Sequence, residues 1–195
     1  RRQRQMCIRD SNNAISDISS GLAETVLVIN PEISTPFVNY TKRDIHFIFG
    51  DGCVATVVSK NNTSNNCFKV IDRKLVTKFS NNIRSDWSYL ARAATDKKTH
   101  EDLLFYQNGN SVFKEVCPMV AEFINNQLKE NNLESIDIKK FWLHQANARM
   151  VKLIVSKIIG TNDFDTELAP LPIEKFGNLA SAGSMFAFNL HNDLE

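Results

Sequence analysis

The sequence predicts an α/β fold in which short apolar strands alternate with amphipathic helices. Residues 25–29 form a β-branched, apolar run, which is typical of a central strand covered on both faces. Apolar side chains in residues 112–128 recur every three or four positions, which predicts a long helix with one buried face. Alternation of these two patterns along 195 residues indicates α/β architecture and a chain long enough to bury a core.

The first part of the chain predicts one helix end and two more strands. Gly21 is expected to close the helix, because glycine at this place adopts the left-handed conformation without strain. Gly50-Asp51-Gly52 predicts a tight turn with positive φ at glycine. We expect His46, in the strand before that turn, to be structural. The expected elements are a helix tail over residues 12–21, a loop over 30–44 and strands over 45–49 and 53–58.

The rest of the chain continues the alternation. Pro118 lies inside the long helix and predicts a kink there. Gly160 is expected to end the next helix, while residues 80–101 give little signal. The expected elements are a hairpin strand over 68–79, the helix over 112–128, a strand over 136–143, a helix over 146–159, a short strand over 168–173 and a helix over 180–190.

Residues 1–11 differ in composition from the rest of the chain. Four arginines crowd this segment, and it shows no apolar period. One interpretation is a basic arm for an acidic partner. The interpretation that we favour is a non-native segment, to be kept out of the fold prediction.

Composition excludes several classes of function. A net charge of +1 gives no overall basic field for nucleic acid. No apolar run reaches the roughly 18 residues that span a bilayer, and no signal sequence precedes the first strand. The four cysteines have no metal-ligand spacing, so we expect reduced thiols and no metal. We therefore expect a cytoplasmic protein that binds neither nucleic acid nor membrane.

Two junctions between elements carry candidate catalytic groups. The stretch FWLHQANAR places His144 where an apolar strand gives way to helical spacing, and KFGN places Asn178 just before a small-residue helix. Side chains at such junctions project from a sheet edge, where a His and an Asn can donate hydrogen bonds to one carbonyl oxygen. The alternative interpretation of the first junction is a structural His144, with Asn147 capping the helix.

These motifs together resemble the C-terminal half of β-ketoacyl-acyl-carrier-protein synthase III. The resemblance rests on HQANAR and FGN, and it is supported by FGDG at residues 49–52 and GNSVFK at residues 109–114. It implies the thiolase-like layered α-β-α-β-α fold, of which this chain would hold the C-terminal half and the last elements of the N-terminal half. We expect truncation at both ends, with a non-native segment at 1–11, the end of the first half at 12–60 and the C-terminal domain at 61–195.

The resemblance also implies an acyltransferase reaction, a decarboxylating Claisen condensation in fatty acid biosynthesis. A cysteine would take an acyl group from acyl-CoA, and malonyl-acyl carrier protein would then lose CO₂ and attack it. His144 and Asn178 would stabilise the enolate oxygen as neutral donors. The nucleophile's place falls near Arg4, and Cys7 lacks the small neighbours of a nucleophile turn. We therefore expect the 195 residues alone to be inactive.

Substrate delivery adds further candidates by the same resemblance. Coenzyme A and phosphopantetheine are carriers of substrate, and no other cofactor is expected. Basic and tunnel-lining side chains would contact them, although each lysine could equally belong to a solvated helix face. The full-length protein would be a homodimer. The candidate substrate-binding residues are Arg43, Asn110, Phe113, Lys114, Ala146, Asn147 and Arg149.

Two alternatives to this function remain open. Leu179 and Met185 stand where the family usually has Thr and Pro, which favours a divergent subfamily with another acyl primer. One alternative is therefore a relative that makes a polyketide, alkylquinolone or long-chain ketone product, or uses medium-chain primers. Another is a non-catalytic thiolase-like partner subunit, but retention of both His144 and Asn178 argues against it.

Overall fold

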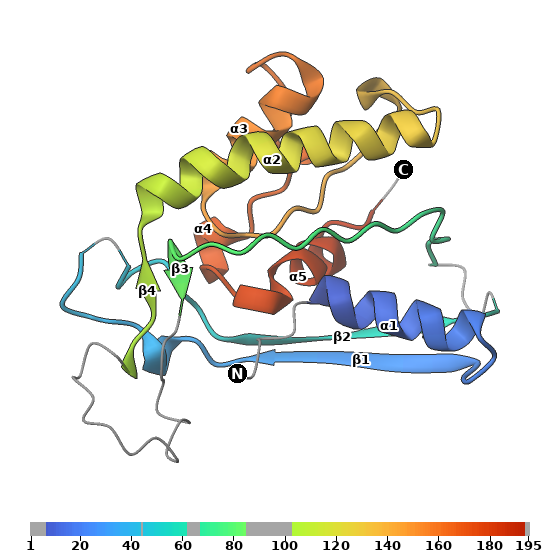
Figure 1. Cartoon of the computed structure of the whole chain (residues 1–195), viewed down its shortest axis with the longest axis horizontal. Coiled ribbons are helices and arrows are strands. Elements are labelled where there is room, and N and C mark those ends of the chain that lie inside the picture. The colour runs from blue at the N-terminus through green and yellow to red at the C-terminus, as the bar shows by residue number, and fades with distance from the viewer. Residues whose placement is uncertain (1–6, 44, 62–66, 85–102, 194–195) are drawn as a thin grey trace.

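The computed structural model describes residues 7–43, 45–61, 67–84 and 103–193. Helix α2 and helix α3 lie on one side of the molecule, α1 and α5 lie in the middle, and the strands β1 and β2 lie on the other side (Figure 1). The principal elements are α1 (Cys7–Ser19), β1 (Thr25–Glu32), β2 (Gly52–Ser59), α2 (Gly109–Glu130), α3 (Ala148–Ile159) and α5 (Gly183–Leu190). Shorter ones are η1 (Thr35–Phe37), β3 (Ile83–Arg84), β4 (Tyr106–Gln107), η3 (Ser135–Asp137), η4 (Thr166–Leu168), α4 (Ile173–Phe176) and η5 (Ala180–Ala182).

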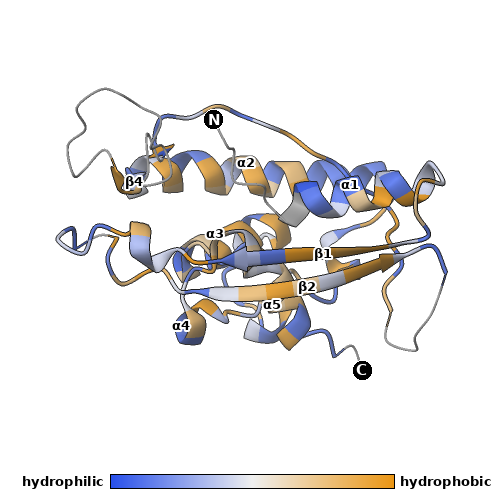
Figure 2. Cartoon of the chain, turned by 90° about the horizontal axis from the view of Figure 1, so that it is seen from below, coloured by the Kyte–Doolittle hydropathy of each residue, from blue (hydrophilic) through white to orange (hydrophobic). Residues whose placement is uncertain are grey.

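Strands β1 and β2 form a two-stranded antiparallel sheet with Thr25 opposite Ser59 and Glu32 opposite Gly52. The prediction that β1 is covered on both faces is wrong for the described residues. Val28 is buried under the helices, whereas Leu27 and Ile29 on the other face are 57% and 54% exposed. In Figure 2 the two strands lie across the molecule with much of their length coloured hydrophobic. The chain thus presents one bare apolar sheet face.

The helices form close to where the pattern predicts them. Helix α2 begins with the side chain of Asn108 accepting from the amide of Ser111, and it continues through Pro118 to Asn131. The Asn147 side chain caps α3, and Gly160 ends it with φ of +81°. Gly21, with φ of +78°, follows α1 as expected. Helix α1 begins at Cys7, so it extends into the segment that the fold prediction leaves out.

One hydrophobic core lies between α2 and α3. Its buried members include Cys117 and Ala121 from α2 and Val151 and Val155 from α3. A smaller cluster joins Val54 of β2 to the α5 region. No helix in the described ranges is both long and apolar enough to cross a membrane.

Four predicted strands do not form among the described residues. Residues 45–48 make turns, and Phe49 pairs with Asn178 through an isolated parallel bridge. The predicted hairpin strand at residues 68–79 is extended but unpaired, and residues 138–147 and 169–172 have no strand. The 30–44 loop is also wrong at its start, because β1 continues through Pro31.

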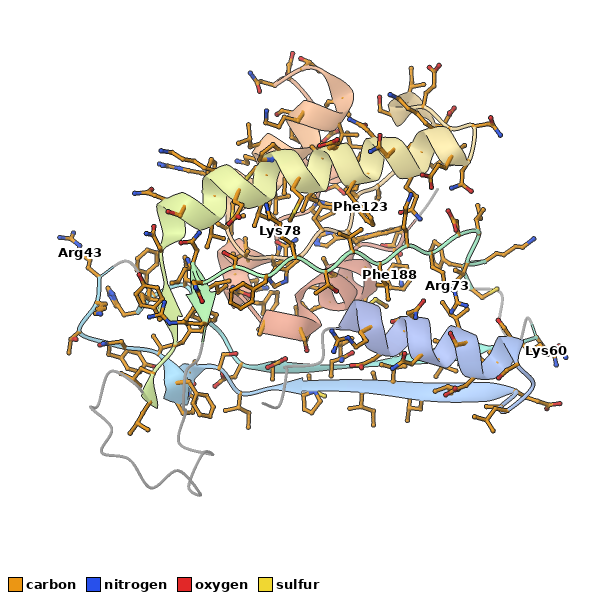
Figure 3. The ribbon with its side chains drawn as sticks, in the orientation of Figure 1. Arg43, Lys60, Arg73, Lys78, Phe123 and Phe188 are labelled. Carbon is orange, nitrogen blue, oxygen red and sulfur yellow. The ribbon has the colours of Figure 1, made fainter. Side chains whose placement is uncertain are left out.

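Side chains, not a ladder, hold the extended segment against the helices. The Lys78 Nζ lies 3.3 Å from a Glu115 carboxylate oxygen of α2, and Figure 3 shows Lys78 beside that helix. Phe68 meets the Phe188 ring of α5 edge-on, with 4.9 Å between ring centroids. These contacts involve side chains only. The backbone of residues 68–79 pairs with no strand among the described residues. Residues 80–101, which give little signal in the sequence, lie mostly outside the described residues.

Candidate active site

His144 lies on the loop just before α3, and its neighbour Gln145 fixes that loop. Gln145 is only 2% exposed. Its Nε2 donates to the Leu143 carbonyl at 3.0 Å and to the Pro170 carbonyl at 3.3 Å, while its Oε1 accepts from the Ile173 amide at 3.4 Å. One buried amide therefore ties the His144 loop to the segment that leads toward Asn178.

The His144 ring is surrounded by protein although part of its surface reaches solvent. Burial lowers the pKa of His144 below its usual value, and the negative charge of Glu32 partly opposes this effect. The ring is therefore neutral at pH 7. Neither ring nitrogen makes a hydrogen bond to another described residue. A neutral imidazole with a free N–H is a suitable donor to a developing oxyanion.

Asn178 is buried, and its main chain is held on both sides. Its amide donates to the Ile48 carbonyl at 2.7 Å, and its carbonyl accepts from the Gly50 amide at 3.1 Å. The side-chain Oδ1 accepts from the Ala180 amide at 2.9 Å. Because the oxygen is occupied in this way, the Nδ2 group is left as a donor with no partner among the described residues.

The glycines beside Asn178 allow two backbones to approach closely. A Cβ at Gly50 would lie 2.1 Å from the Phe176 carbonyl oxygen, and one at Gly177 would lie 3.0 Å from the Gly50 nitrogen. The predicted positive φ at Gly50 and Gly52 is wrong: Gly177, with φ of +72°, carries it instead. Close packing, and not turn conformation, is thus the reason for glycine in FGDG.

Both candidate donors contact one turn, η5 with its junction to α5. Asn178 bonds to Ala180 at the start of this turn. At the other end, a Cβ placed on Gly183 would lie 3.3 Å from the His144 Nδ1. The hollow between the two loops, lined by residues that include Gln145, Gly177, Leu179 and Gly183, is too small to hold a water molecule, and neither His144 nor Asn178 lines it.

The sequence motifs do not single out Glu32, yet it belongs to this site. Its Oε1 accepts from the amide of Ser181 at 3.2 Å, although 149 positions separate them. A glutamate at the end of an apolar strand is the signal that could have revealed it. Asp51 is bound differently: its carboxylate accepts from Ser34 and Thr35 and fixes η1.

The other candidate residues take three kinds of position. Asn147 caps α3 by accepting from the Arg149 amide at 2.8 Å, as the alternative interpretation expects. Phe113 and Ala146 pack against the core between α2 and α3. The remaining candidates are exposed, and Figure 3 shows Arg43 pointing away from the molecule on the loop after η1. These are Arg43, Asn110, Lys114 and Arg149. Their contacts with substrate remain predictions.

Comparison with known proteins shows the family of the chain. Two family models match, 3-oxoacyl-[acyl-carrier-protein] synthase III over residues 12–78 and the C-terminal region of the same synthase over residues 128–193. Together they cover more than half of the chain, and the His144 and Asn178 loops both lie within the second matched region.

Individual relatives match along nearly the whole chain. β-Ketodecanoyl-[acyl-carrier-protein] synthase of Pseudomonas aeruginosa is 42% identical over 182 residues, which are 92% of this chain and 52% of that protein. β-Ketoacyl-[acyl-carrier-protein] synthase III of Campylobacter curvus is 31% identical over 90% of this chain and 51% of its own. The chain therefore spans about half the length of the curated relatives it matches.

Solved structures of these synthases also match nearly the whole chain and about half of their own length. The crystal structure of 3-oxoacyl-(acyl carrier protein) synthase III from Pseudomonas aeruginosa matches with a TM-score of 0.78 and 19% identity, over 94% of this chain and 55% of that one. The fold is thus the α/β, thiolase-like fold of these synthases. With both family models matched in order, the chain belongs to the 3-oxoacyl-[acyl-carrier-protein] synthase III family.

Proposed function

We propose that His144 and Asn178 form the decarboxylation site of an acyltransferase that condenses an acyl primer with a malonyl thioester. The observation that carries the proposal is a pair of neutral donors that contact opposite ends of one turn, each without a protein partner among the described residues. Neither donor nitrogen is a buried unpaired atom, because among the described residues only the Asn30 Oδ1 and the Ser34 hydroxyl are, so both nitrogens stay open to solvent and to a ligand. A thioester oxygen is such a ligand.

The bond changes explain why these donors must be neutral and fixed. The bond between the malonyl carboxylate and its α-carbon breaks, CO₂ leaves, and the electron pair moves onto the thioester oxygen as an enolate. The N–H of His144 and the Nδ2–H of Asn178 donate to that oxygen more strongly as its charge grows. The α-carbon then attacks an acyl thioester on a cysteine, the thiolate leaves, and a β-ketoacyl product forms.

The described cysteines do not supply that nucleophile at this place. Cys117 is buried in the core between α2 and α3, and Cys53 and Cys67 are exposed. Cys53 lies on β2 opposite Pro31. We therefore assign to this chain the malonyl-activating part of the reaction and make none of these three cysteines the acyl carrier.

A medium-chain primer is the favoured substrate. The 42% identical relative is named for a β-ketodecanoyl product, and a ten-carbon β-ketoacyl chain arises from an eight-carbon primer plus two malonyl carbons. Leu179 supports divergence from short-chain synthases, because it fills the space beside Gly52 where the family usually has Thr. Fatty acid synthesis is the pathway class that fits such a product, and polyketide, alkylquinolone or ketone synthesis remains the alternative.

Delivery of both substrates requires positive charge at the surface. Lys114 and Arg149 are exposed at the starts of α2 and α3, and Arg43 is exposed on the loop after η1. Phosphates of coenzyme A and an acidic carrier protein would be attracted to such groups. We further propose a homodimeric full-length protein and a cytoplasmic location, which suits the buried thiol of Cys117.

A chimaera tests the proposal. Residues 12–193 would replace the matching half of the Pseudomonas aeruginosa β-ketodecanoyl synthase, with the unsubstituted relative as positive control. We expect release of CO₂ from malonyl-carrier protein and a β-ketoacyl product from octanoyl-CoA. A chimaera that is acylated on its cysteine but releases no CO₂ would contradict the proposal. A product from acetyl-CoA alone would contradict the primer assignment.

A further inference from the structure

The covered face of strand β1 changes from apolar to polar side chains toward the site. Successive side chains on its covered face are Val28, Asn30 and Glu32, so an apolar position is followed by two polar ones. The Asn30 Nδ2 donates to the Asp10 carboxylate of α1 at 3.1 Å. Glu32 continues this row to the end of β1, where the strand meets η5.

The Glu32 carboxylate accepts a hydrogen bond from the turn η5, which lies between Asn178 and the His144 contact. It accepts from Ser181, which is buried and lies three residues after Asn178. Gly183, two residues further, packs against the His144 ring. Glu32 and His144 thus meet the same turn, and Asn178 begins it.

We propose that Glu32 is a positioning residue of the decarboxylation site: its carboxylate fixes the turn that carries Asn178 and places negative charge on the side of that turn facing His144. This inference rests on the proposed function. Its first consequence is geometric, because the direction of the Asn178 amide depends on the turn that Ser181 anchors. Its second is electrostatic, since among the described residues Glu32 is the ionised group that raises the pKa of His144 against the effect of burial.

Variants of one strand separate these consequences. Glu32→Gln keeps an oxygen that can accept from Ser181 but removes the charge, whereas Glu32→Ala removes both. Glu32→Asp keeps the charge on a shorter side chain. Glu24→Gln is the matched control, because Glu24 is an exposed carboxylate just before β1 and its backbone carbonyl accepts from Lys60.

The first measurement uses the 195-residue chain and needs no activity. NMR titration of ring-labelled histidine follows His144, assigned among the four histidines by a His144→Gln variant. We expect Glu32→Gln to lower the pKa of His144, while Glu24→Gln and Glu32→Asp leave it near the parent value. An unchanged His144 pKa in Glu32→Gln, with parent-like signals from the other histidines, would overturn the electrostatic role.

The second measurement uses the chimaera and tests the geometric role. We expect Glu32→Ala to lower the decarboxylation rate about tenfold or more, which is the scale of a small misplacement of catalytic groups. Glu32→Gln should keep most of the parent rate. A parent rate in Glu32→Ala would overturn positioning. If His144→Ala itself leaves decarboxylation unchanged, the proposed function fails, while the NMR comparison still decides the place of Glu32.

Discussion

The carbonyl oxygen of Asn178 accepts a hydrogen bond from the amide of Gly50 at 3.1 Å, which joins two loops more than a hundred residues apart. The amide of Asn178 donates to Ile48 in turn, so the catalytic candidate is fixed by its backbone on both sides of Phe49. Only a glycine fits at residue 50, because Phe176 occupies the space that a side chain would need. Adding one methyl group at residue 50 therefore tests how far the Asn178 loop depends on this close packing.

Gly50→Ala should destabilise the protein strongly. Its Cβ would lie 2.1 Å from the Phe176 carbonyl, and the backbone must shift to relieve the overlap. We expect the free energy of unfolding to fall by about 3 kcal/mol, at the upper end of overpacking effects. Urea unfolding measures this, with Gly109→Ala as control, because a Cβ there meets nothing closer than 3.4 Å. Equal stability of the two variants would show that the close approach does not constrain the loop.

Leu179→Thr tests the departure from the family pattern. Leu179 is 3% exposed and packs with Val54, Ala182 and Phe186. Threonine would leave a cavity and bury a hydroxyl, so we expect a loss of about 2 to 3 kcal/mol in the free energy of unfolding. Leu190→Thr, at an exposed helix end, should cost far less in the same urea experiment. An unchanged free energy of unfolding in Leu179→Thr would mean that the site accepts the family residue without repacking.

Asp51 gives a stability effect that depends on pH. Slight burial raises the pKa of its carboxyl, but the hydrogen bonds from Thr35 and Ser34 outweigh this and hold the pKa below the usual value. A lowered folded-state pKa stabilises the folded chain above the unfolded pKa, and this stability is lost as pH falls through the folded value. Asp51→Asn should therefore lower the urea midpoint more at pH 7 than at pH 3, which lies below the unfolded pKa of about 3.9. The same deficit at both values would contradict the ionic role.

The bare sheet face should drive association of the 195-residue chain. Leu27, Ile29 and Val57 expose a contiguous apolar surface on β1 and β2, which is the kind of surface that soluble monomers avoid. Ile29→Lys should shift light-scattering chromatography toward monomer with little change in the thermal midpoint. Thr25→Lys, also exposed at the end of the same strand, is the control. A sharp monomeric peak for the parent chain would refute the expectation.

The sequence was most informative where a pattern is local. Helical spacing, capping by Asn147 and closure by Gly160 depend on a few neighbouring residues, and each was predicted correctly. Strands 45–49, 68–79 and 136–143 were wrong because a strand needs a partner, and apolar alternation cannot show whether the described residues provide one.

In the site, too, local motifs could be predicted and long-range contacts could not. His144 and Asn178 were predicted from motifs, and the structure places them against opposite ends of one turn, while their catalytic role stays a proposal. Glu32 was missed, because its local signal is only a glutamate at the end of an apolar strand and its role depends on a hydrogen bond to Ser181 across most of the chain. Gln145 stood inside the motif, but only its buried contacts with Pro170 and Ile173 show why an amide is needed there.

Half-reactions of His144 and Asn178 variants in the chimaera test the central claim most directly. Both residues are assigned to the malonyl oxygen and neither to the nucleophile, so acylation of the cysteine, followed by mass spectrometry, should survive in each variant. CO₂ release should fall about a hundredfold or more in His144→Ala, the usual scale for one lost donor. Asn178→Asp should be worse than Asn178→Ala, because a carboxylate would repel the enolate. Loss of acylation with persistent CO₂ release would instead make His144 the base of the cysteine and contradict the assignment.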